Sequence, residues 1–73
     1  MVVMEMEHPL TTARKAARLT QQELAGLVGC ERWMINRIEA GTRQPSMRLL
    51  QALVEHTGVS ADDLLRWKAG AAA

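Results

Sequence analysis

The stretch QQELAGLVGCERWMINRIEAG, residues 21–41, contains two short helical patterns separated by Gly29. On both sides of this glycine, apolar residues recur at the spacing of a helix with one buried face. They are Leu24, Ala25, Val28, Ile35 and Ile38. Glycine readily adopts the left-handed conformation that ends a helix in a tight turn, and a small residue such as Ala25 allows a second helix to approach. The stretch therefore predicts two helices packed against each other across a short turn.

The second of these helices carries large polar and aromatic side chains on the side that Ile35 and Ile38 leave free. They are Arg32, Trp33, Asn36 and Arg37. A tryptophan exposed on an isolated helix is typical of a surface that meets a partner. This side of the helix is therefore the first candidate for a binding site.

Caps and glycines divide the rest of the chain into helices by the same rules. Five are predicted, at about residues 9–18, 20–29, 31–40, 46–58 and 60–67. Pro9 suits the first turn of the first helix, and Thr20 with Glu23 forms a capping box, as does Ser60 with Asp63. Gly26 interrupts the second helix; it marks either a close helix approach or tolerated slack.

The chain is all-α by these signals, and its 73 residues suffice for one domain. Because Phe and Tyr are absent, its core has to be aliphatic. We expect the folded domain to span residues 9–68, with a tail at 69–73. The segment 1–8 is either a tail or a short strand that pairs with a second subunit, since VVMEMEH alternates apolar and polar residues.

Composition argues against several classes of protein. No apolar run approaches the roughly 20 residues of a membrane helix, and the N-terminus lacks the pattern of a secretory signal. His8, His56 and the single Cys30 lack metal-ligand spacing, and Cys30 suits packing, with redox sensing as the alternative. We find no catalytic constellation and expect no enzyme, no metal and no cofactor. A reducing cytoplasm is the expected location.

Charge is unevenly distributed along the chain. Between Thr11 and Arg48 seven basic residues face three acidic ones, a balance of +4, whereas the first ten residues carry −2 and those from Leu49 onward carry −1. A basic centre of this kind is a modest indication of a polyanionic partner.

Three pieces of the sequence, in order and with the right gaps, resemble the phage repressor and Cro-like family of helix-turn-helix regulators. They are LTQQELAGLVG, INRIEAGTRQPS and GVSADDLL. The resemblance covers about residues 10–65. It implies a compact five-helix, lambda-repressor-like DNA-binding domain, with the helix-turn-helix formed by the second and third helices.

The resemblance also implies roles for individual residues. Arg32, Trp33, Asn36 and Arg37 would read base edges in the major groove, where arginine pairs with guanine and asparagine with adenine. The DNA backbone would be contacted by Gln21, through its side chain or its amide, and by Thr42, Arg43 and Arg18, with weaker claims for Lys15 and Arg48. Arg14 and Glu39 match an ion pair that braces the recognition helix. Glu31 departs from the family, which usually has Ser or Thr capping this helix.

The leading interpretation is a sequence-specific regulator of double-stranded DNA, a repressor that binds a palindromic operator as a homodimer. Dimerisation is expected through Leu64, Leu65 and Trp67, with the N-terminal segment as reinforcement. Alternatives with the same DNA mechanism are the antitoxin of a toxin–antitoxin pair, whose further partner is a toxin, and a restriction–modification control protein. The rival from another class is a protein-interaction module that kept the fold without binding DNA.

Overall fold

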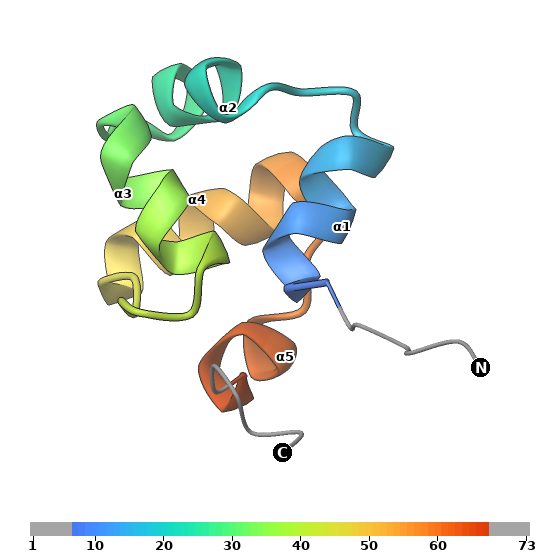
Figure 1. Ribbon diagram of the computed structural model, residues 1–73, viewed down its shortest axis with the longest axis vertical. Coiled ribbons are helices and arrows are strands. Elements are labelled where there is room, and N and C mark those ends of the chain that lie inside the picture. The colour runs from blue at the N-terminus through green and yellow to red at the C-terminus, as the bar shows by residue number, and fades with distance from the viewer. Residues whose placement is uncertain (1–6, 68–73) are drawn as a thin grey trace, which may run out of the picture.

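Five helices make up the computed structural model, which describes residues 7–67 of the chain. They are α1 (Pro9–Ala16), α2 (Gln21–Val28), α3 (Arg32–Glu39), α4 (Met47–Thr57) and α5 (Ala61–Arg66). Figure 1 shows α2 and α3 joined by a short turn, with α4 passing behind α3 and α5 set apart below. Residues 7–67 contain no strand, so the all-α prediction is confirmed; the proposed N-terminal strand lies largely outside the described residues.

The boundaries of α2 are fixed by the residues that the sequence singled out. The Thr20 side chain accepts a hydrogen bond from the Glu23 amide, at 3.0 Å, and the Glu23 carboxylate accepts one from the Thr20 amide, at 2.9 Å. Gly29 ends the helix in the left-handed conformation, with a φ of 78°. The amides of Gly29 and Cys30 both donate to the Ala25 carbonyl, which closes the turn before α3.

One predicted boundary and one predicted capping box are wrong in detail. The first helix ends at Ala16, not at Arg18, because Arg18 takes a left-handed backbone conformation with a φ of 61° that no helix continues. At α5, the Ser60 side chain accepts from the Asp63 amide, at 3.2 Å, but within residues 7–67 no return bond from Asp63 completes the capping box.

The start of α1 at Pro9 is as predicted, and His8, directly before it, is buried in the folded domain. Its side chain is 6% exposed, and its Nδ1 accepts a hydrogen bond from the Leu10 amide at 3.1 Å, so that it caps the helix. Histidine is not a preferred N-cap residue, which is why the sequence pattern placed it with the N-terminal segment.

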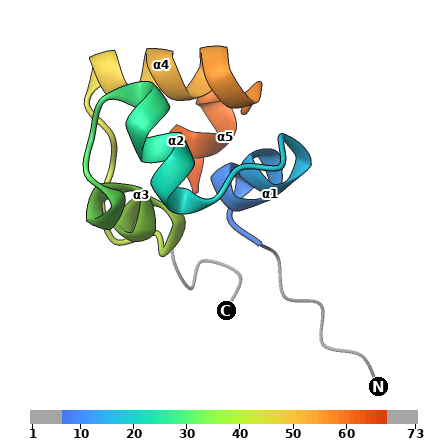
Figure 2. The ribbon, with the colours of Figure 1, turned by 90° about the horizontal axis from the view of Figure 1, so that it is seen from above.

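The core is aliphatic, as the composition requires, and every helix contributes to it. Its members are Leu10, Leu24, Ala25, Ile35, Ile38, Leu49, Leu50, Leu53, Val59 and Leu64. The helix α2 packs on both α3 and α4, and Figure 2 shows it between them. As a result α3 lies at the edge of the molecule, with one side in the core and the other in solvent.

Candidate nucleic-acid interface

The helix α3 divides into a buried and an exposed side. Ile35 and Ile38 are 0% and 1% exposed and pack against the Leu24 and Ala25 side of α2. The four predicted base-reading residues are all exposed, and two pairs of them, Arg32 with Asn36 and Trp33 with Arg37, are one helical turn apart. The packing of α2 on α3 therefore sets the direction in which these four side chains point.

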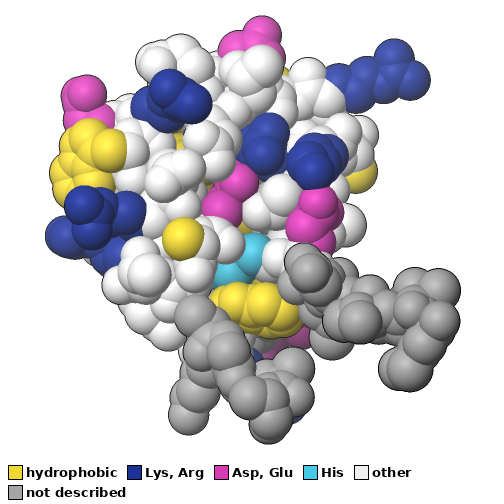
Figure 3. All heavy atoms as spheres, viewed as in Figure 1, with side chains coloured by type: hydrophobic (Ala, Val, Ile, Leu, Met, Phe, Trp, Pro, Cys, Tyr) yellow, Lys and Arg dark blue, Asp and Glu magenta, His cyan; other side chains and the backbone are white. Residues whose placement is uncertain are grey.

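Trp33 is the largest exposed hydrophobic side chain of α3, at 49% exposure, and it lies against two arginines. The guanidinium carbon of Arg37 is 5.9 Å from the centre of its ring, and that of Arg43 is 5.5 Å away. Both distances are within the range of cation–π attraction. Figure 3 shows hydrophobic atoms bordered by basic side chains at the edge where Figure 1 places α3. We call Trp33, Arg37 and Arg43 the tryptophan–arginine cluster.

The loop after α3 returns toward the helix through Thr42. Its amide and its hydroxyl both donate to the Arg37 carbonyl, at 3.1 and 3.2 Å, and so satisfy a free carbonyl near the end of α3. The Thr42 hydroxyl, predicted to contact DNA phosphate, is therefore engaged with the helix in the free protein. Arg43, the next residue, is exposed beside Trp33.

A buried ion pair connects α1 to the end of α3, where the sequence predicted one. Arg14 Nε lies 2.6 Å from Glu39 Oε2 and Arg14 Nη2 lies 3.2 Å from Oε1, with the two side chains 12% and 6% exposed. Arg14 Nη1 also donates to the Leu19 carbonyl, at 2.8 Å. The pair thus joins α1, the α1–α2 loop and α3.

Gln21 takes part in the same network, which bears on how it could contact phosphate. Its side-chain amide donates to Glu39 Oε1 at 3.0 Å, so the predicted phosphate contact is left to its backbone amide at the N-terminus of α2. Burial alone would raise the pKa of Glu39, but hydrogen bonds from Arg14 and Gln21 outweigh burial and lower this pKa. Glu39 therefore holds its charge within the domain.

Of the remaining basic candidates, Arg48 is exposed in the first turn of α4, and Arg18 and Lys15 lie at the α1 end of the molecule. Arg18 is exposed in the loop that leads into α2. Lys15 Nζ lies 2.7 Å from Glu7 Oε2 in a solvent-exposed ion pair, so its charge is partly offset by a residue that the sequence did not link to it.

The expected dimer surface on α5 is only partly available. Leu64 is 2% exposed and belongs to the core, so its assignment to an interface between subunits is wrong. Leu65 is 45% exposed. Trp67 is partly buried against its own domain, with its ring centre 5.4 Å from that of His8 in an edge-to-face arrangement. In a six-residue helix, spacing alone did not decide which of two adjacent leucines faces the core.

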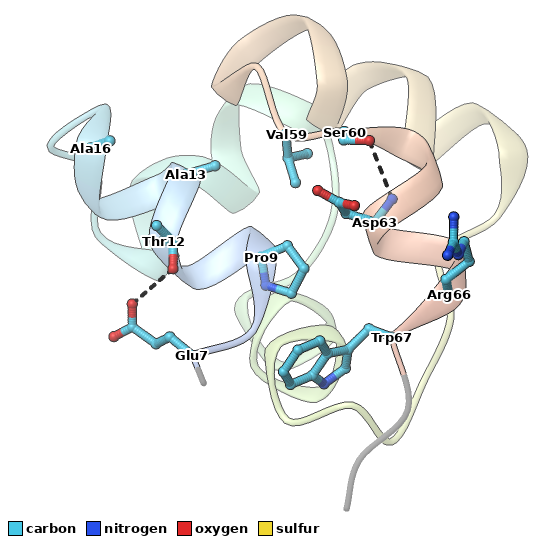
Figure 4. A pocket seen from close by; sticks show the side chains of 10 residues that line it. All are labelled: Glu7, Pro9, Thr12, Ala13, Ala16, Val59, Ser60, Asp63, Arg66 and Trp67. Carbon is cyan, nitrogen blue, oxygen red and sulfur yellow. Dashed lines mark hydrogen bonds between the residues drawn. The ribbon is translucent and has the colours of Figure 1, made fainter. Parts of the chain in front are cut away.

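A groove between α1 and α5 extends from this tryptophan. Its volume is about 630 Å³, and Figure 4 shows Pro9 and Trp67 at one end and Val59 and Asp63 at the other. Burial in this region lowers the pKa of His8, and the negative charge of Glu39 opposes that effect only in part. His8 is therefore held in its neutral form, which its role as hydrogen-bond acceptor requires.

Outside this interface, the reactive and metal-binding groups of the described residues show no arrangement of a site. Cys30 is partly buried against the core, and burial raises the pKa of its thiol, which suits packing. Across residues 7–67 no three His, Cys, Asp or Glu side chains gather in a way that could hold a metal ion. None of the described helices is long and apolar enough to cross a membrane.

Comparison with known protein families identifies the motif that contains the exposed helix α3. Residues 10–64, most of the chain, match a family model described as helix-turn-helix. No curated protein matches the sequence. The matched range includes α2, the turn at Gly29 and α3, together with the loop that carries Thr42 and Arg43.

Proposed function

The chain belongs to the helix-turn-helix family of phage repressor and Cro-like DNA-binding regulators, and from this premise we propose that it is a sequence-specific transcriptional repressor. It binds a palindromic operator as a homodimer, with α3 of each subunit in the major groove. The observation that carries the proposal is the exposed side of α3. There Arg32, Asn36 and Arg37 stand free of the core, at the N-terminal and central turns that approach base edges.

The chemistry of these side chains supports base reading. A guanidinium group can donate two hydrogen bonds to O6 and N7 of guanine, and an asparagine amide can pair with adenine. We assign contacts with phosphates, which set position and affinity, to Arg43, Arg18 and the backbone amide of Gln21. Glu31 directly precedes α3 and does not cap it through its side chain, so its carboxylate is free to accept a hydrogen bond from cytosine N4.

Dimerisation through α5 is the second part of the proposal. Leu65 gives this helix an exposed apolar side chain, and Trp67 adds part of its ring. The Leu65 carbonyl also accepts a hydrogen bond from the Gln44 side chain, at 3.3 Å. Because Gln44 follows Arg43, contact between two copies of α5 would fix the two arginine-bearing loops relative to each other.

The exposed Trp33 favours a second candidate, a protein-interaction module that uses α3 to bind another chain. An antitoxin or a restriction–modification control protein differs from the repressor in its protein partner and not in how it contacts DNA.

The decisive experiment is selection from a randomised duplex library, with sequencing of the bound fraction at two salt concentrations. A palindromic consensus whose binding weakens steeply with salt would support the proposed repressor, because bound arginines and lysines release counterions from DNA. Selection of no sequence at either concentration would contradict it and turn the search to a partner protein for Trp33.

One variant pair makes this experiment specific to α3. Arg37→Ala is expected to relax the preference at one base pair of each half-site and to weaken binding about 10- to 100-fold, the range for loss of one bidentate base contact. Arg66→Ala removes the same charge from α5, where Arg66 forms an exposed ion pair with Asp62. It is expected to preserve the preference at that base pair, and relaxation of the same preference in both variants would argue against base reading by α3.

A further inference from the structure

We infer that Trp33 is a positioning residue: its indole ring holds the guanidinium groups of Arg37 and Arg43 together on the face that meets DNA. The inference rests on the proposed function and deepens it. In this role the ring orients two side chains. Arg37 then supplies part of the sequence preference, and Arg43 makes the neighbouring phosphate contact.

The geometry that carries the inference is the shared ring. Arg37 follows Trp33 by one helical turn, whereas Arg43 lies beyond the end of α3, in the loop. Both guanidinium carbons nonetheless lie within 6 Å of the same ring centre, at 5.9 and 5.5 Å. Indole is the side chain that attracts cations most strongly through its face.

The backbone prepares this arrangement. The two hydrogen bonds from Thr42 to the Arg37 carbonyl return the loop to the helix directly before Arg43. The loop therefore brings Arg43 to the ring by main-chain geometry, and the ring then restricts the side chain. Without this attractive surface, the two positively charged side chains would be free to move apart into solvent.

The consequence for binding follows from side-chain entropy. A free arginine loses many rotamers when it docks on a base or a phosphate, and a side chain that is already ordered loses fewer. Trp33 thus favours the bound conformation of both arginines before DNA arrives. The number of positive charges does not depend on the ring, so the salt dependence of binding should not depend on it either.

This role differs from direct contact between Trp33 and a thymine methyl group. If Trp33 only packed on thymine, leucine at this position would preserve part of the binding. Removal of the tryptophan would then alter the preference at that thymine alone. If Trp33 positions the arginines, phenylalanine preserves part of the binding because it keeps an aromatic face. Removal of the tryptophan then alters the preference at the base pair that Arg37 reads.

The test uses Trp33→Phe and Trp33→Leu, with Leu27→Ala as control at another exposed apolar residue of the motif, which is 50% exposed. The first measurement is nuclear magnetic resonance of the free protein. The side-chain methylene protons of Arg37 and Arg43 are expected to show ring-current shifts that Trp33→Leu abolishes and Trp33→Phe retains in part. Unchanged shifts in Trp33→Leu would overturn the inference whatever the outcome with DNA.

The second measurement is affinity for the selected duplex and its variants at two salt concentrations. Trp33→Leu is expected to bind about tenfold more weakly, since two exposed cation–π contacts together are worth about that factor. Its salt slope should match that of the original chain, and its preference should relax at the base pair affected by Arg37→Ala. Trp33→Phe should stay within about threefold, and Leu27→Ala should have no effect.

The outcomes separate the inference from the proposed function. If a duplex is selected but Trp33→Leu and Trp33→Phe bind it equally well, or the preference changes only at another base pair, the positioning role is wrong and the repressor proposal stands. If no duplex is selected, the proposed function fails and the inference fails with it.

Discussion

At the scale of single residues, two glycines at α2 differ in whether the fold needs glycine at their position. Gly26 lies in the middle of α2, where an added Cβ atom would meet nothing within 4 Å. Gly29 also has open space around it, but its φ of 78° is one that other residues rarely adopt. Gly26 is therefore tolerated in the helix and does not mark a close approach of another element, whereas Gly29 is required by the turn.

This contrast gives the first prediction. Gly26→Ala should raise the free energy of unfolding by about 0.5–1 kcal/mol, because alanine restricts the unfolded chain and favours the helix. Gly29→Ala should lower it by about 1–2 kcal/mol through the left-handed backbone. Urea denaturation of both variants measures the difference, and a loss of stability in Gly26→Ala would show that the middle of α2 has a constraint beyond its helical geometry.

At the scale of helices, α3 depends on a brace from α1. The Arg14–Glu39 pair is almost fully removed from solvent, and it is joined by Gln21. Removal of one partner leaves the other charge buried without compensation. The resulting loss of stability is far larger than the stability that the intact pair contributes.

Glu39→Ala should therefore lower the free energy of unfolding by about 3 kcal/mol. The matched control is Asp62→Ala, which breaks the exposed pair with Arg66, whose side chains are 71% and 77% exposed. The control should change stability by less than about 0.5 kcal/mol. Chemical denaturation followed by circular dichroism distinguishes the two, and similar small losses would mean that water reaches the Arg14 site.

The sequence was sufficient for the helices whose ends are set by local chemistry. Thr20, Ser46 and Gly29 act through neighbours a few positions away, so α2 and the start of α4 could be placed from the pattern. The end of α1 could not, because Ala17 and Arg18 are good helix formers. The helix stops there because the chain has to turn back so that Leu19 reaches the core and its carbonyl reaches Arg14.

The candidate site was likewise predictable only where it depends on local sequence. Helical spacing alone placed Arg32, Trp33, Asn36 and Arg37 on one side of α3. The position of Arg43 beside Trp33 depends on how the loop folds back through Thr42, and no local pattern specifies that path. The engagement of Gln21 by Glu39 likewise depends on how α2 and α3 pack.

At the scale of the whole molecule, stability should depend on pH through His8. The fold lowers its pKa from the ordinary value of 6.5, so the unfolded chain binds more protons near that pH. Stability is then fully present above about pH 6.5 and is lost as the pH falls toward the folded-state pKa, by at most about 1.4 kcal/mol per pH unit. The contribution of Glu39 is lost only at lower pH, below its ordinary value of 4.5.

His8→Asn should remove this dependence, because asparagine can cap α1 without titrating. His56→Asn, at an exposed histidine near the end of α4, is the control and should keep it. Denaturation midpoints at neutral pH and at about pH 5 provide the measurement. If His8→Asn loses stability between these conditions as much as the original chain does, another group is responsible.

Assembly is the other property of the whole molecule. Leu65→Asp should convert the proposed dimer to a monomer, because a carboxylate would be buried at the contact without a partner. Leu27→Asp introduces the same charge at a leucine of α2 with 50% exposure, and the dimer should persist. Sedimentation measures both masses. A monomeric original chain, or a dimer that tolerates Leu65→Asp, would contradict assembly through α5.

The two sides of α3 also affect how such a protein can acquire a new target over generations. Ile35 and Ile38 hold the helix in the core, so mutations at Arg32 and Asn36 can accumulate one at a time with little effect on folding. Arg37 and Arg43 both lie against the Trp33 ring, so changes at these three residues are not independent in this way. A duplicated gene could therefore drift freely at the first two positions, while a new preference at the cluster would require coordinated change at three.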